Sequence, residues 1–146
     1  ISDDSELYAH MNINYLRLDG PLPRYGDGWQ PVVDALRDGA FFTTTGEVLI
    51  PSFTIDGAQS GETTAPGSSV TVRAAIEWTF PLAFAEIVSG DGTKVYRERI
   101  DLIDRGEFGT ATISRTMDLR GRKWARLEVW DVAANGAFTQ PVFFSQ

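Results

Sequence analysis

The chain has one histidine and no cysteine among its 146 residues, which leaves few ways to build a catalytic centre. A Ser-His-Asp triad would have to use His10, and no Gly-x-Ser-x-Gly sequence accompanies it. The lack of cysteine removes thiol catalysis, thiolate metal sites and disulfide bonds together, and it leaves the cellular compartment open. We therefore predict no catalytic residue in this chain.

The specific functional interpretation of His10 is that it contributes to a partial metal site. Glu6 lies four residues before His10, so both side chains would share one face of a helix. A hydrolytic zinc ion usually needs three protein ligands, so Glu6 and His10 would be at most half of a site. We expect no bound cofactor in this chain.

Acidic residues at expected turns raise the question of calcium. The candidates are Asp56, Glu62, Asp91, Asp101 and Asp104. The Asp-x-Asp-x-Asp-Gly calcium loop is missing, and Asp-Gly pairs at 56–57 and 91–92 are typical of turns. A catalytic pair of facing carboxylates, as in glycoside hydrolases, stays open as an interpretation, but the sequence singles out no two of the acidic residues.

The charge balance disfavours two classes of partner. The net charge is −7, and the thirteen basic residues are dispersed, whereas nucleic-acid binding needs a basic patch. An anionic membrane surface is disfavoured for the same reason. No apolar run approaches the ~18–20 residues that span a bilayer. We expect neither nucleic acid nor membrane as a partner, and self-association stays open.

Two tryptophans invite a binding interpretation. Trp124 and Trp130 are six residues apart on an expected strand, so they share a face with Arg126 and Glu128 between them. Such a face suits a contact with another domain, and aromatic platforms also suit sugar rings. The tryptophans would equally fit the core of a sandwich. These three interpretations stay open for Trp124, Arg126 and Trp130.

One helix is expected, near residues 31–38. Pro31 suits its first turn, Gly39 is placed to end it, and Val32, Val33 and Leu36 share a face. After Ala40 the apolar pattern changes to a period of two, which predicts strands.

About eight strands follow, at the spacing of an antiparallel β-sandwich, immunoglobulin-like in general architecture. We predict them at 41–45, 48–55, 69–78, 82–89, 94–101, 111–119, 124–132 and 138–144. Turn signals predict hairpins across 90–92, across 120–122 and at Asn135-Gly136, and Pro141 predicts an edge or a bulge in the last strand. Val70, Val72, Ile76, Leu127 and Val129 should be buried.

The expected organisation is an N-terminal extension over residues 1–40 and a β-sandwich domain over 41–146. Residues 12–18 have the composition of a strand, but glycines and prolines separate them from the sandwich. We expect this extension to form the junction to a further N-terminal domain of the same chain, which would be the main partner.

The passage Gly28-Trp29-Gln30-Pro31-Val32-Val33-Asp34-Ala35-Leu36-Arg37-Asp38-Gly39-Ala40-Phe41-Phe42-Thr43-Thr44-Thr45-Gly46 resembles bacterial metallohydrolases of the polymerase-and-histidinol-phosphatase (PHP) type, in the carbaryl-hydrolase-like group. There "Ala-Leu-Arg-x-Gly" leads into "Phe-x-Thr-x-Gly", and a β-sandwich tail follows the catalytic barrel. Phe138-Thr139-Gln140-Pro141-Val142 looks like the close of that tail.

The chain departs from this family in a metal-ligand pair and in the passage itself. The family's last ligand pair is Asp-x-His, whereas Tyr8 stands two residues before His10, and Glu47 follows Gly46 where the family often has proline. No ligand is carried over. The resemblance implies a tail domain of a multi-metal hydrolase.

Three functional hypotheses follow. The leading one is a non-catalytic C-terminal accessory domain of a larger, metal-dependent hydrolase. The alternative is a free-standing ligand-binding module, for example for carbohydrate. The third is an enzyme that uses an unrecognised pair of carboxylates. A glycan array would test the second hypothesis, and a panel of hydrolase substrates the third.

Overall fold

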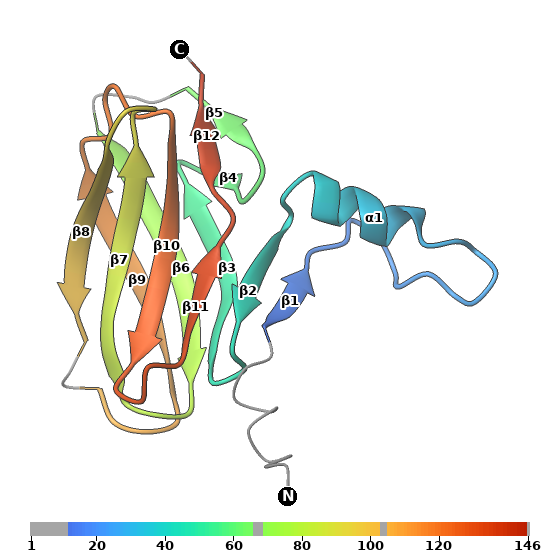
Figure 1. Ribbon diagram of the computed structural model, residues 1–146, viewed down its shortest axis with the longest axis horizontal. Helices are drawn as coiled ribbons and strands as arrows, with labels where there is room; N and C mark the ends of the chain where they lie inside the picture. The colour runs from blue at the N-terminus through green and yellow to red at the C-terminus, as the bar shows by residue number, and fades with distance from the viewer. Residues whose placement is uncertain (1–11, 66–68, 103–104, 146) are drawn as a thin grey trace, which may run out of the picture.

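Two β-sheets pack face to face, with one short helix beside them (Figure 1). The computed structural model describes residues 12–65, 69–102 and 105–145. Most strand pairs are antiparallel, so the predicted antiparallel β-sandwich is confirmed. The helix α1 (Gln30–Arg37) lies where the sequence predicts it.

The eight-stranded sheet is built around one long central strand. Its members are β1 (Ile13–Leu16), β2 (Phe41–Thr44), β5 (Thr63–Thr64), β7 (Leu82–Gly90), β8 (Val95–Asp101), β10 (Trp124–Asp131), β11 (Gly136–Thr139) and β12 (Val142–Phe144). One side of β10 pairs with β7, which pairs with β8. The other side pairs with β11 and then β12, and β2 and β1 continue from β11.

The four-stranded sheet covers the other side of the core. It holds β3 (Val48–Ile55), β4 (Ala58–Gln59), β6 (Val70–Trp78) and β9 (Gly109–Met117). In β6 the residues alternate between buried and partly or fully exposed, because one face meets the core and the other meets solvent.

The core lies between the two sheets, where inward side chains from both meet. Val70, Val72 and Ile76 come from the smaller sheet, and Leu127 and Val129 from the larger one. Each of the five is at most 1% exposed, so their predicted burial is confirmed.

The predicted hairpin across residues 120–122 is wrong. Strand β9 pairs with β6 in the smaller sheet, whereas β10 pairs with β7 in the larger one, so the chain crosses between sheets here. Gly121 adopts a positive φ of 73° in this connection. A tight turn that crosses from one sheet to the other needs the same residues as a hairpin turn, so local sequence does not separate them.

The hairpins after β7 and after β10 are confirmed, with two refinements. The turn after β10 lies at residues 132–135, where Ala134 has φ 65°, and Gly136 already belongs to β11. The predicted last strand is divided into β11 and β12 at Pro141, which has no N–H to donate to a ladder.

The extension joins the larger sheet through β1, which pairs with β2 over four residues. Gly39, with φ 73°, follows the last turn of α1, as the sequence predicts. Ala35 is the buried residue of α1, and the helix lies to one side of the sandwich (Figure 1). Among the described residues, no helix has the length and apolar character needed to cross a membrane.

Candidate functional site

The three residues singled out on β10 lie together on the outer face of the larger sheet. Trp124, Arg126 and Trp130 are half-buried, while the alternate residues Leu127 and Val129 point into the core. The two tryptophans therefore do not fill the space between the sheets.

Each of these tryptophans covers a glycine on the neighbouring strand. Trp124 lies opposite Gly90 and Trp130 lies opposite Gly136. A Cβ atom added to Gly90 would lie 2.6 Å from the Trp124 ring, and one added to Gly136 would lie 2.5 Å from the Trp130 ring. The indole rings thus rest directly on neighbouring backbone, an arrangement that protects glycine within a sheet.

Glu128 lies between the tryptophans and is 6% exposed. Its carboxylate accepts a 2.6 Å hydrogen bond from Arg126 Nη2 and a 3.3 Å bond from Arg97 Nη1. Burial is the largest single influence on its pKa and raises it, but the bonds and charges of the two arginines together outweigh burial. The pKa of Glu128 is therefore lower than usual, and the carboxylate is ionised at neutral pH.

Two arginines of this face also cover aromatic rings. The guanidinium carbon of Arg99 lies 4.0 Å from the centre of the Phe84 ring, and that of Arg126 lies 5.3 Å from the centre of the Phe138 ring. Arginine and aromatic residues are enriched at protein contacts, so this outer face has a suitable composition for one. Its charged groups already bind one another within the chain.

The metal candidates divide into two groups. Glu6, His10 and Asp104 lie outside the described residues. Within the described part of the chain, no group of three His, Asp or Glu side chains is placed to hold a metal ion.

The two Asp-Gly pairs form turns, as predicted. Asp56 and Gly57 both have positive φ in the two-residue turn between β3 and β4. Asp91 accepts hydrogen bonds from the backbone N–H groups of Lys94 and Thr93, which hold the pKa of its carboxyl well below the usual range.

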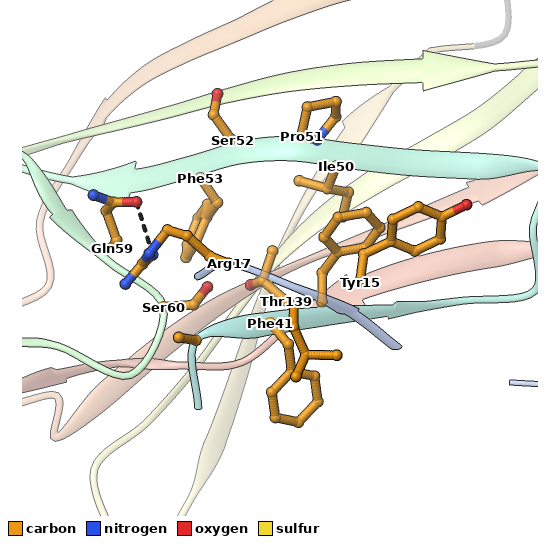
Figure 2. Close-up of a pocket in the computed structure, with 13 residues that line it drawn as sticks. Tyr15, Arg17, Phe41, Ile50, Pro51, Ser52, Phe53, Gln59, Ser60 and Thr139 are labelled. Atoms are coloured by element: carbon orange, nitrogen blue, oxygen red, sulfur yellow. Dashed lines mark hydrogen bonds between the residues drawn. The ribbon is translucent and has the colours of Figure 1, made fainter. Parts of the chain in front are cut away.

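A pocket lies at the open edge of the sandwich, between β1 and β2 of one sheet and β3 and β4 of the other; we call it the edge pocket (Figure 2). Its volume of about 320 Å³ is at the lower end for small-molecule sites. Tyr15 and Arg17 line it from the extension, Phe42 and Phe53 from the sandwich, and Gln59 from β4.

The edge pocket combines a stacked aromatic pair with one cation. The Tyr15 and Phe42 rings are nearly parallel, with their centres 5.1 Å apart and 8° between their planes. Arg17 Nη1 donates a 2.7 Å hydrogen bond to Gln59 Oε1, which Figure 2 marks, and Arg17 Nη2 lies 3.4 Å from Glu62 Oε1. An aromatic wall and an oriented guanidinium can together hold an apolar ligand with an anionic group.

A second cavity of about 570 Å³ lies on the other side of Arg17; we call it the acidic cavity. Arg17 is its only basic lining residue among those described, and its carboxylates belong to Asp19, Asp34, Asp38 and Glu62. Arg17 therefore separates an aromatic pocket from an acidic one.

The sequence prediction missed the edge pocket. Its residues come from five separate parts of the chain, and β1 had no predicted pairing partner. The available signal was the spacing of Tyr15 and Arg17, which are two residues apart and would therefore lie on one face of a strand.

Neither the protein-family models nor the curated proteins with which we compared the sequence match this chain.

Proposed function

We propose that this chain is a non-catalytic accessory domain of a larger, metal-dependent hydrolase, and that it contacts the catalytic domain through α1 and the loop before it. The resemblance to PHP-type metallohydrolases is the basis for the proposed type of parent protein. The exposed side chains of the extension are the basis for the proposed contact surface.

The observation that carries the proposal is an exposed apolar face on α1. Trp29, Val33 and Leu36 are 62%, 43% and 42% exposed, and their spacing places them on one side of the helix. Leu22 and Tyr25, in the preceding loop, are 72% and 102% exposed. We call these five residues the helix surface.

This surface contrasts with the rest of the molecule. The described residues include twelve exposed large apolar side chains, and seven of them lie between residues 13 and 36. A surface helix normally turns its apolar stripe toward the core, but α1 buries only Ala35. Clustered apolar exposure of this kind marks a contact with another protein surface.

The test compares the isolated chain with the full-length protein, both carrying Val33→Glu and Leu36→Glu. Both residues are exposed and Glu is a good helix former, so the isolated chain should keep its thermal midpoint within a few degrees. In the full-length protein the same change should weaken the domain contact. This should appear as separate unfolding transitions and faster proteolysis in the loop at residues 19–28.

Thr112→Glu, on the exposed face of β9, is the matched control and should leave both proteins unchanged. An unchanged unfolding profile for the full-length double variant would refute docking through α1. If the isolated chain is a dimer that the double variant dissociates, the helix surface joins two copies and the domain contact is refuted.

The alternative function is a free-standing ligand-binding module, for which carbohydrate was the example given from the sequence. The edge pocket favours ligand binding in general and not a sugar in particular. A glycan array with the isolated chain separates the two functions. Specific glycan binding that is lost on Tyr15→Ala, in a variant that circular dichroism shows to be folded, would favour the binding module over the accessory domain.

A further inference from the structure

We propose that the edge pocket binds a small aromatic monocarboxylate, with its carboxylate on Arg17 and its ring between the Tyr15–Phe42 pair and Phe53. This inference goes beyond the proposed accessory role and does not depend on docking through α1.

The lining of the edge pocket selects an apolar ligand body. Most of its lining residues are apolar or aromatic, and Phe53 is 5% exposed, so its ring forms a fixed wall. The stacked rings of Tyr15 and Phe42 form a second aromatic wall, on which another ring can pack. A volume of about 320 Å³ limits the ligand to one or two small rings.

Arg17 selects a negative charge at one end of the ligand. It is the only charged side chain among the described residues that line the edge pocket. Gln59 fixes the guanidinium with a 2.7 Å hydrogen bond, and Glu62 approaches it at 3.4 Å. Arginine has five N–H donors, so these two contacts leave enough of them to hold a carboxylate by two parallel bonds.

The spacing of Tyr15 and Arg17 suits a ring that carries a short acidic arm. Residues i and i+2 of a strand lie about 7 Å apart and point to the same side. Figure 2 shows the Tyr15 ring and the Arg17 guanidinium extending from neighbouring positions toward different ends of the pocket. Phenylacetate, a ring that carries a carboxylate on a one-carbon arm, is a small probe of this ligand class.

The surroundings disfavour two other ligand classes. Sugar binding usually uses carboxylates as hydrogen-bond acceptors for hydroxyl groups, and no carboxylate is present among the described lining residues of the edge pocket. A dicarboxylate would leave its second charge without a cationic partner, because Arg17 is the only charged side chain among the described lining residues. The pocket therefore favours a single carboxylate.

The experiment titrates phenylacetate and its neutral analogue phenylacetamide into the whole chain and follows backbone amide signals by NMR. Phenylacetate should bind saturably and move the signals of Tyr15, Phe42 and Gln59. Arg17→Gln should weaken phenylacetate at least about tenfold, because a charge-assisted pair is lost. The same variant should change the affinity for phenylacetamide by less than about threefold.

Arg17→Lys and Arg99→Gln complete the design. Lysine keeps the charge without the paired donors, so its affinity for phenylacetate should be intermediate. Arg99 covers Phe84 on the outer face, so its replacement should leave binding unchanged. The amide spectrum of each variant shows whether it is folded, and Arg17→Lys tests the proposal if Arg17→Gln is not.

Three results would overturn the proposal. The first is no saturable binding of phenylacetate in the millimolar range. The second is binding that neither Arg17 variant alters, which would indicate a nonspecific apolar crevice. The third is glucose or cellobiose binding in the same pocket as tightly as phenylacetate, which would indicate a carbohydrate site instead.

Discussion

Tyr15→Ala should lower the free energy of unfolding by about 2–3 kcal/mol, because Tyr15 anchors β1 to the sandwich. The side chain is 45% exposed, so somewhat more than half of its area is buried against Phe42 and the pocket. With roughly 200 Å² for a tyrosine side chain and about 25 cal/mol per Å², the buried part contributes ~2.5 kcal/mol. Stacking adds about 0.5–1.5 kcal/mol, and residual burial in the unfolded chain lowers the total.

Urea unfolding of the isolated chain, followed by circular dichroism, measures this difference. Tyr15→Phe keeps the stacked ring, and the Tyr15 hydroxyl has no hydrogen bond to the described residues, so this control should stay within about 0.5 kcal/mol of the original. A loss below about 0.5 kcal/mol for Tyr15→Ala would refute the reasoning. Strand β1 would then not be held against β2 in solution, and Arg17 would lose its place in the edge pocket.

Three further predictions concern stability. The pKa of Glu128 is lowered in the folded chain, so this residue stabilises the fold above the unfolded pKa of about 4.3, and the stabilisation is lost as the pH falls through the folded pKa. Glu128→Gln should therefore flatten the acid dependence of stability, measured by urea unfolding between neutral and acidic pH. Gly61→Ala should cost at least about 2 kcal/mol in urea unfolding, because φ is +85° and the new Cβ would lie 1.9 Å from the Asp38 carbonyl oxygen. Gly136→Ala should cost about 1–3 kcal/mol by displacing Trp130, and a thermodynamic cycle with Trp130→Ala should show a smaller cost once the ring is removed.

Each of these predictions has a control and a contrary result. Glu98→Gln, on exposed β8, should keep the acid dependence, and an unchanged slope for Glu128→Gln would contradict the lowered pKa. Gly20→Ala should be nearly neutral, since nothing lies within 4 Å of the new atom. Additive effects of Gly136→Ala and Trp130→Ala would show that the two residues do not interact.

The strands and the core could be predicted because burial on one face leaves a period of two in the sequence. Val70, Val72 and Ile76 alternate with polar residues, and both the strand and its burial are confirmed. The pairing after β9 could not be predicted, because a turn signal gives the position of a turn and not the sheet that the chain enters next. The short strands β4 and β5 have too few residues to show any period.

The edge pocket could not be predicted for a related reason. Tyr15 and Arg17 belong to a segment whose alternation is poor, and Phe42, Phe53 and Gln59 approach them only after β1 has paired with β2. Sequence spacing along a single strand does show which side chains share a face, so the grouping of Trp124, Arg126 and Trp130 was accessible. What it does not show is which residue lies opposite each of them.

Two surfaces are candidates for the proposed domain contact: the outer face of β10 and the exposed apolar side of α1. On β10, each tryptophan rests on a glycine, and Arg126 binds Glu128, so these groups have their partners within the chain. On α1, Val33 and Leu36 are 43% and 42% exposed, and the helix turns Ala35 toward the sandwich instead. Covering apolar side chains with another domain removes them from water, a gain that the satisfied charges of β10 do not offer to the same degree. We therefore place the proposed contact on α1, within the extension that the sequence predicts to be the junction, and not on the outer face of β10.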